Sequence, residues 1–309
     1  MRRKVDASIL LLLTPVLWGA TFPATKIALR HLPVPPFMAW TRLLGFLTVL
    51  ALLPLFAGGG RRIGRRWGSG VVAALGPGAI LGALMFLGYF LQTEGQARTS
   101  ATNAGFITGT YVVFVPFLLS LVFRRRLPAA AWLAGVVSLA GLALLSIQDL
   151  QTLRPHFGDL LVLAGALGWA GHIVAVGYFS PRFRPEVLSL AQLGVAALLH
   201  LAAAMGTGLR PEAAAGADVL PLLLITGVLG TGVAFSIQIF AQRTVTAARA
   251  VIVLAGEGIF AAIFAAAWLH ERLALRQWLG AALVLMAMAY SELRARRPAV
   301  TRLDPAAVP

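Results

Sequence analysis

Long apolar stretches alternate with short polar segments along the whole chain. A bilayer core about 30 Å thick needs roughly 20 apolar residues of helix, and ten stretches have about that length. They lack the polar–apolar alternation of barrel strands, and a helix satisfies its own backbone hydrogen bonds in lipid. The pattern therefore predicts an all-α integral membrane protein with ten transmembrane helices. The expected spans are residues 7–29, 37–57, 71–95, 100–123, 129–147, 158–180, 187–206, 219–241, 245–268 and 275–293.

The lysine and arginine residues are unevenly divided between the two sides that ten spans create. Seventeen lie in the terminal segments and in the loops after even-numbered spans, six lie in the other loops, and Lys26, Arg42 and Arg249 lie inside spans. Basic residues gather in cytoplasmic loops. We therefore expect both termini in the cytoplasm. Residues 298–309 are proline-rich and predicted to form a disordered cytoplasmic tail.

Composition strengthens the membrane interpretation. Of the chain's residues 59% are hydrophobic and 12% are charged, whereas soluble domains carry about 25% charged residues. The net charge of +15 occurs as short clusters such as Arg124-Arg125-Arg126, not as a basic helix face. We therefore expect contacts with the lipid bilayer and no nucleic-acid partner. The chain has no cysteine, which excludes disulfides and cysteine-held metals, and we expect no cofactor and no metal site.

The two halves of the sequence are related by a shift of 146 positions. The shift places Gln92 on Gln238, Tyr111 on Glu257, and Arg126-Leu127 on Arg272-Leu273, and slightly larger shifts pair Trp18 with Trp169 and Arg42 with Gln192. Each half holds five predicted spans, so the second copy must enter the membrane from the opposite side. We therefore predict two inverted five-helix repeats, residues 7–147 and 157–293. Such a pair favours alternating access, and hence a secondary transporter.

Three stretches carry motifs of a known family. They are Trp18-Gly19-Ala20-Thr21-Phe22 with Lys26, Thr99 to Phe106 and on to Pro116, and Glu257 through His270-Glu271-Arg272-Leu273 to Trp278-Leu279-Gly280. On these motifs the chain resembles the EamA family of the drug/metabolite transporter superfamily over nearly its whole length. The resemblance implies a ten-span exporter of small-molecule substrates (amino acids, related metabolites or toxic amphiphiles) in the bacterial inner membrane. We expect a monomer or a homodimer.

Glu257 is the sharpest candidate for a substrate-binding residue. Ionisable groups at lipid depth are costly and usually face a cavity or a partner, and Glu257 lies near the middle of the ninth span between two glycines. It could bind a cationic or amino group, or carry a coupling proton. The alternative is a structural ion pair with Arg249, Arg42 or Lys26.

Aromatic and amide residues recur at equivalent places in the two repeats. Trp18 and Trp169 are too deep for the interfacial belt, so they could flank a central cavity or simply pack helices. Gln92 and Gln238 are expected in the cavity, whereas Gln96 and Gln242, four residues later on the same faces, are expected to be structural. The full set of predicted substrate-binding residues is Trp18, Thr21, Arg42, Tyr89, Gln92, Asn103, Thr110, Tyr111, Trp169, His172, Gln238 and Glu257. Pro15, Pro23, Pro77 and Pro116 could break or merely kink their spans.

A membrane-embedded enzyme and a channel are the alternatives to a transporter. A membrane-embedded enzyme needs a catalytic constellation, and the sequence has no H-E-x-x-H motif and no paired-aspartate motif. A channel needs a filter sequence, and none is visible. The absence of a G-x-x-x-x-G-K-[ST] loop excludes ATP-driven transport by this chain alone. Coupling to a proton gradient and uncoupled exchange both stay open.

Overall fold

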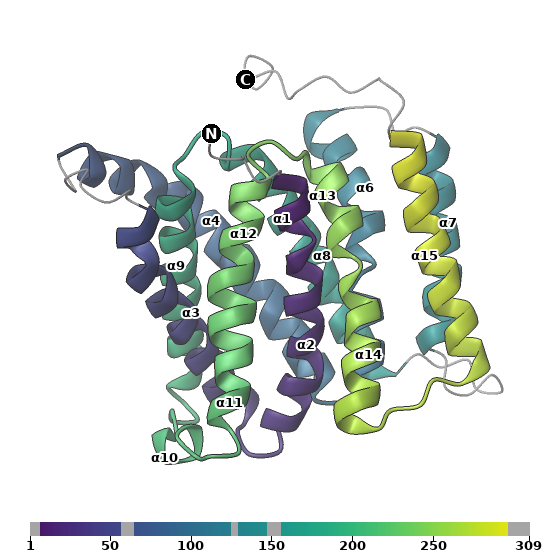
Figure 1. Cartoon of the computed structure of the whole chain (residues 1–309), viewed down its shortest axis with the longest axis horizontal. Coiled ribbons are helices and arrows are strands. Elements are labelled where there is room, and N and C mark those ends of the chain that lie inside the picture. Colours follow the sequence, from purple (N-terminus) through teal and green to yellow (C-terminus); the bar gives the residue numbers. More distant parts are fainter. Residues whose placement is uncertain (1–6, 57–64, 125–128, 147–155, 296–309) are drawn as a thin grey trace.

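The computed structural model describes residues 7–56, 65–124, 129–146 and 156–295, and these residues form a bundle of helices joined by short connections (Figure 1). No strand occurs in these ranges. The predicted tail at 298–309 and most of the basic N-terminal segment lie outside the described residues. The helices are α1 (Ala7–Leu11), α2 (Leu13–Ala28), α3 (Val34–Phe56), α4 (Arg65–Gln96), α5 (Ala101–Thr108), α6 (Tyr111–Phe123), α7 (Ala129–Ser146), α8 (Phe157–Phe179), α9 (Pro185–Ala204), α10 (Pro211–Ala214), α11 (Leu220–Leu223), η1 (Leu224–Val233), α12 (Ala234–Ala241), α13 (Ala247–Leu254), α14 (Glu257–Leu269) and α15 (Leu275–Ala295).

The all-helical architecture predicted from the sequence is confirmed for the described residues. Eight helical stretches there are long and apolar enough to cross a membrane. The fifth and tenth expected spans correspond to α7 and α15, which pack against each other at one side of the bundle (Figure 1). Within α15, the stretch Leu275–Ala287 is apolar. The chain is therefore a multi-pass membrane protein, and its described residues contain eight clear spans besides α7 and α15.

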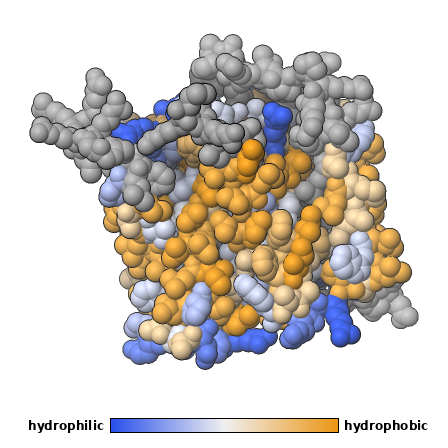
Figure 2. Space-filling view, viewed as in Figure 1, coloured by the Kyte–Doolittle hydropathy of each residue, from blue (hydrophilic) through white to orange (hydrophobic). Residues whose placement is uncertain are grey.

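The outer surface has the polarity of a membrane protein. Figure 2 shows hydrophobic side chains covering the middle of the visible face, with hydrophilic ones along its lower edge. Leu121 is 77% exposed and Leu198 is 67% exposed. Large exposed apolar surface is unfavourable in water, so lipid is the environment that suits these side chains. The first described helix begins, and the last one ends, at the same end of the bundle (Figure 1).

Two of the spans are broken at equivalent places. The fourth changes from α5 to α6 at Gly109-Thr110, and the ninth changes from α13 to α14 at Ala255-Gly256. Adding 146 to the residue numbers of the first break, and of the helix ends beside it, gives the residue numbers of the second break and its helix ends. This is the same shift that relates the two halves of the sequence. The correspondence extends to the left-handed residues that end the second halves, Arg124 (φ 50) and His270 (φ 55). The repeat is thus visible in backbone geometry as well as in residue identity.

The prolines account for only one of the interruptions. Pro15 has no N–H to donate to the carbonyl of Leu11, where α1 ends, and this matches the break between α1 and α2. Pro77 and Pro116 lie inside α4 and α6, which continue past them. The breaks that shape the fourth and ninth spans fall at small and polar residues instead.

The eighth span contains a wide turn of π-helix. Over Leu224–Val233 the hydrogen bonds follow the i−5 pattern, and the Thr231 hydroxyl also donates to the Thr226 carbonyl, 2.8 Å away. Glycines line this segment where α2 and α3 approach it: a Cβ on Gly227 would lie 2.8 Å from Leu44 Cβ. π-Helical turns are rare and frequent at functional sites. Within this turn, the Gly230 carbonyl accepts a hydrogen bond from a donor that lies outside its own helix.

Candidate functional site

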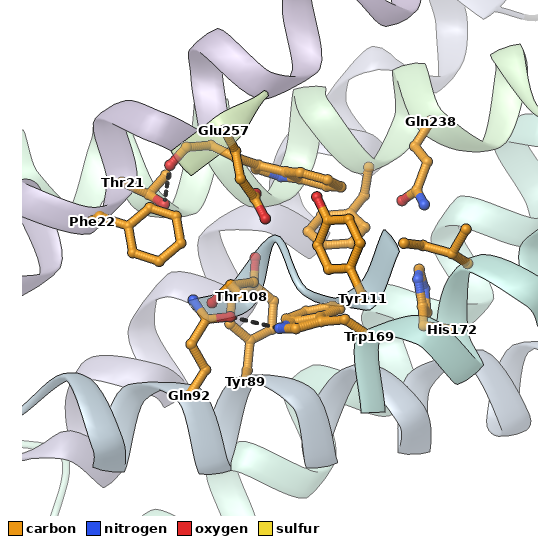
Figure 3. Close-up of a pocket in the computed structure, with 13 residues that line it drawn as sticks. Thr21, Phe22, Tyr89, Gln92, Thr108, Tyr111, Trp169, His172, Gln238 and Glu257 are labelled. Carbon is orange, nitrogen blue, oxygen red and sulfur yellow. Dashed lines mark hydrogen bonds between the residues drawn. The ribbon is translucent and has the colours of Figure 1, made fainter. Parts of the chain in front are cut away.

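A cavity lies in the middle of the bundle, between the two broken spans. Its walls come from α2, α4 and α8, from α12, and from residues beside the two breaks. The cavity among them is small, with a volume of about 30 Å³, so its walls would have to move apart to hold a metabolite. The lining residues are Trp18, Thr21, Phe22, Tyr89, Gln92, Thr108, Tyr111, Trp169, His172, Ile173, Phe235, Gln238 and Glu257 (Figure 3).

Most of the residues predicted from the sequence come together here. The predicted residues that line the cavity are Trp18, Thr21, Tyr89, Gln92, Tyr111, Trp169, His172, Gln238 and Glu257. They are drawn from six spans and from both halves of the chain. Whether they bind a substrate stays a prediction, but the structure places them around one space.

Arg42, Asn103 and Thr110 do not line the cavity. Arg42 is 2% exposed, and its guanidinium carbon lies 3.4 Å from the centroid of the Tyr89 ring, so Tyr89 separates it from the cavity. Asn103 instead accepts a hydrogen bond from Gln277 of α15, at 3.3 Å. Thr110 donates to the Ile107 carbonyl within the break, at 2.6 Å. Positions seven apart share a face only on a continuous helix, and the break at Gly109-Thr110 removes that relation.

Four residues that line the cavity were not predicted from the sequence: Phe22, Thr108, Ile173 and Phe235. Phe235 lies three residues before Gln238, so helical spacing could have found it. The carbonyls of Phe22 and Ile173 accept hydrogen bonds from Gln96 Nε2 (2.5 Å) and Gln242 Nε2 (3.0 Å). These two contacts are equivalent in the two repeats, and they give Gln96 and Gln242 the structural role expected of them. Thr108 could be located only once the helix break was known.

Aromatic rings form one wall of the cavity. Phe235 lies between the two tryptophans, with its ring centroid 4.8 Å from that of Trp18 and 5.7 Å from that of Trp169. Tyr89 meets Trp169 edge to face at 4.5 Å. The indole N–H of Trp18 donates to the Gly230 carbonyl of the π-helix at 2.9 Å, and that of Trp169 donates to Gln92 Oε1 at 2.6 Å. Both tryptophans are therefore held in fixed orientations beside the cavity.

Glu257 has no cationic partner in the part of the chain that the structure describes. It is 4% exposed, it is the first residue of α14, and its Oε1 has no hydrogen-bond partner. Two ion pairs of the described ranges, Arg98–Glu94 and Arg184–Glu186, lie elsewhere and do not involve Glu257. Figure 3 shows the Glu257 carboxylate pointing toward the Tyr111 hydroxyl, a donor that interacts with it without forming a hydrogen bond of normal geometry. The structure thus favours a cavity-facing carboxylate over the structural ion pair.

A chain of hydrogen bonds fixes how Gln238 is oriented. The Ile173 carbonyl can only accept, so Gln242 must turn its Nε2 toward it, and Gln242 Oε1 then accepts from Gln238 Nε2 at 2.9 Å. This leaves Gln238 Oε1 buried without a hydrogen-bond partner. Gln92 is held the opposite way, because Trp169 is only a donor and takes its oxygen. The two equivalent glutamines therefore present opposite polarity.

A second group of polar residues ties both halves together at the end of the bundle where α2 ends. We call Lys26, Thr99, Asp159 and Glu271 the end cluster. Lys26 Nζ donates to the carbonyls of Gln96 (3.0 Å), Ala97 (3.3 Å) and Thr99 (2.6 Å). The Thr99 hydroxyl donates to Asp159 Oδ1 at 2.5 Å. The Glu271 carboxylate accepts from the backbone N–H groups of Ala101 and Thr102, at 3.0 and 3.1 Å, where a helix N-terminus favours negative charge.

Neither the cavity nor the end cluster is built as a metal site. Within the described ranges no group of three or more histidine, aspartate or glutamate side chains is placed to hold a metal ion. The chemistry that the cavity offers is recognition: an aromatic wall, amide groups of fixed orientation, and one carboxylate.

Comparisons with known proteins agree with this geometry. The sequence profile described as the EamA-like transporter family matches residues 7–147 and again residues 156–291. An "Uncharacterized transporter" from Archaeoglobus fulgidus is 32% identical over 292 residues, covering 94% of this chain and 87% of that protein. The "Uncharacterized transporter YoaV" of Bacillus subtilis is 24% identical, covering 87% and 90% of the two chains. A solved crystal structure shares the fold, with a TM-score of 0.67 at 18% identity over 97% of this chain.

Proposed function

This chain belongs to the EamA-like transporter family and is a membrane transporter; we propose that it is a ten-span secondary carrier that exports small metabolites by alternating access. The two profile matches follow one another along the chain. In this proposal each contributes five spans, α7 and α15 being the fifth and the tenth, and the two repeats cross the membrane in opposite senses. Export is the direction that the family resemblance implies.

The observation that carries the proposal is the pair of equivalent helix breaks on either side of one cavity. Inverted repeats can exchange conformations, so that a site between them opens first to one side and then to the other. Helix breaks supply the hinges and the polar backbone groups that such an exchange needs. Tyr111 and Glu257 begin the second halves of the two broken spans, and both line the cavity.

Thiol labelling tests the mechanism, because the natural chain has no cysteine. The variant Thr108→Cys places one thiol in the cavity, and Leu121→Cys serves as a lipid-facing control. A membrane-impermeant maleimide is applied to vesicles of each orientation. Alternating access requires Thr108→Cys to react from both sides of the membrane, and Leu121→Cys to react from neither. Reaction from one side only, in every lipid and ion condition, contradicts the proposal.

Planar-bilayer recording separates a carrier from a channel. A channel would also admit the reagent from both sides, but it would give unitary ionic currents, whereas a carrier of this kind gives none. The topology has its own test. An epitope in the segment 148–155 must be accessible on the membrane side opposite to both chain ends, and finding it on their side rejects two inverted five-span repeats.

A further inference from the structure

The cavity presents two buried hydrogen-bond acceptors that the protein does not fully satisfy, although the Tyr111 hydroxyl interacts with one of them, Glu257. Glu257 Oε1 and Gln238 Oε1 are both buried without a partner, in residues that are 4% and 0% exposed. A buried polar atom that stays unpaired costs about 1–3 kcal/mol, so such atoms in a binding cavity indicate what the bound ligand supplies. The other unpartnered atoms of the lining are compatible with a donor as well: the Thr108 and Tyr111 hydroxyls can accept, and His172 Nδ1 accepts when Nε2 donates to Gln192. The ligand that satisfies this lining therefore carries hydrogen-bond donors.

The charges of the residues that line the cavity further limit the kinds of ligand that could bind. Among the described residues, the cavity wall contains one carboxylate, Glu257, and neither lysine nor arginine. Arg42 lies behind the ring of Tyr89, and Lys26 is engaged with three carbonyls in the end cluster. A ligand carboxylate would meet no cation in the cavity, whereas a ligand cation would meet an unpaired carboxylate and the faces of aromatic rings.

The two unpaired acceptors lie apart along the cavity. Figure 3 shows Tyr111 between Glu257 and Gln238, with Trp169 alongside. One ammonium group would bind at Glu257, and a separate donor would bind at Gln238. The body that joins them would lie along the aromatic wall of Trp18, Phe235 and Trp169.

We propose, building on the carrier function above, that the substrate is an aromatic or similarly apolar amine: a cation with N–H groups for Glu257, a second hydrogen-bond donor for Gln238, and no carboxylate. The equivalent positions in the first repeat, Tyr111 and Gln92, do not duplicate these acceptors, because Tyr111 carries no charge and the oxygen of Gln92 is taken by Trp169. The ligand therefore binds in one orientation despite the repeat.

Binding to the purified full-length protein in lipid nanodiscs tests this, with isothermal titration calorimetry as the measurement. Four probes differ by one feature each. Tyramine has the ammonium and a distal hydroxyl; 2-phenylethylamine lacks the hydroxyl; N,N,N-trimethyltyramine has the charge without N–H groups; and tyrosine adds a carboxylate. A hydrogen bond to a charged group is worth about 10-fold to 100-fold in affinity. We expect tyramine to bind saturably and the trimethyl and carboxylate analogues to bind at least about tenfold more weakly.

Variants assign the two acceptors. Glu257→Gln should weaken tyramine binding by about tenfold or more, whereas the control Glu212→Gln, at an exposed position in α10, should not. Gln238→Leu should abolish the preference for tyramine over 2-phenylethylamine and leave the affinity for 2-phenylethylamine unchanged. Circular dichroism melting of each variant shows whether it is folded.

Three results would overturn the proposal. They are equal binding of the trimethyl analogue, binding of tyrosine at least as tight as that of tyramine, and absence of binding by both amines to folded protein. None of these bears on the thiol-labelling experiment, which needs no ligand. Labelling of Thr108→Cys from both sides without amine binding would reject the substrate class and keep the carrier.

Discussion

Replacing Lys26 with methionine is predicted to loosen the end of the bundle where α2 ends. The change keeps the aliphatic stem and removes the ammonium that binds the carbonyls of Gln96, Ala97 and Thr99. Hydrogen bonds from a charged donor contribute about 1.5–3 kcal/mol each. The 3.3 Å contact is long and the site is partly exposed, so water replaces part of the loss. About 1–3 kcal/mol remains, which corresponds to roughly a 5-fold to 150-fold shift in a two-state equilibrium.

The end cluster joins residues of both halves, so this energy bears on how that end opens. We expect the cavity thiol of Thr108→Cys to react faster from that side of the membrane when Lys26→Met is added, and more slowly from the other side. The matched control is Arg30→Met, which removes an exposed cation one turn farther along. If both double variants react alike, or if reaction from that side slows, the end cluster does not hold this end closed.

Three further changes follow from other contacts. Glu271→Ala removes the acceptor for two N–H groups at the start of α5, and it should lower the free energy of unfolding in SDS by about 0.5–2 kcal/mol; an effect no larger than that of Glu212→Ala would contradict this. Gly95→Ala drives a methyl group into the Gly158 carbonyl, whereas Gly76→Ala in the same helix meets nothing within 4 Å. The first should destabilise by about 1–3 kcal/mol and the second should not, and equal melting temperatures would refute the packing argument. Trp18→Phe keeps a ring beside Phe235 but leaves the Gly230 carbonyl unpaired, so it should cost about 1–3 kcal/mol in the same unfolding assay, and no change would show that water replaces the indole.

The apolar pattern predicted the helical architecture because lipid leaves the backbone few alternatives. Length and hydropathy located the spans, but they could not locate the interruptions within them. At Gly109-Thr110 and Ala255-Gly256 the backbone hydrogen bonds tighten locally to the i−3 pattern, a change that the length and hydropathy of a span do not reveal. The π-helix of η1 likewise reflects tertiary contacts, since Trp18 supplies the donor for the Gly230 carbonyl.

The site was predictable to the extent that the repeat marks it. Trp18 with Trp169, and Gln92 with Gln238, could be predicted to lie together because they occupy equivalent positions in the two repeats, and they line the same cavity. Arg42, Asn103 and Thr110 were misplaced for two physical reasons. Arg42 is screened from the cavity by Tyr89, and the helix break turns Asn103 toward α15. Neither side-chain rotamers nor helix breaks can be predicted from the spacing of residues in the sequence alone.

In the proposed carrier, substrate specificity would come from the differences between the repeats, because the features that they share form only the common scaffold of the site. A perfectly symmetric site would bind a ligand equally well in two orientations and would favour neither side of the membrane. Here Glu257 faces its counterpart Tyr111, and Gln238 offers an oxygen where Gln92 does not. At the ends, Lys26 has Gly177 as its counterpart by the same shift of 151 that pairs Trp18 with Trp169. Lys26 therefore has no cation at the equivalent sequence position of the second repeat. In the proposed carrier, the end held by Lys26 would open against a larger energy than the other end, and that inequality would set the resting conformation.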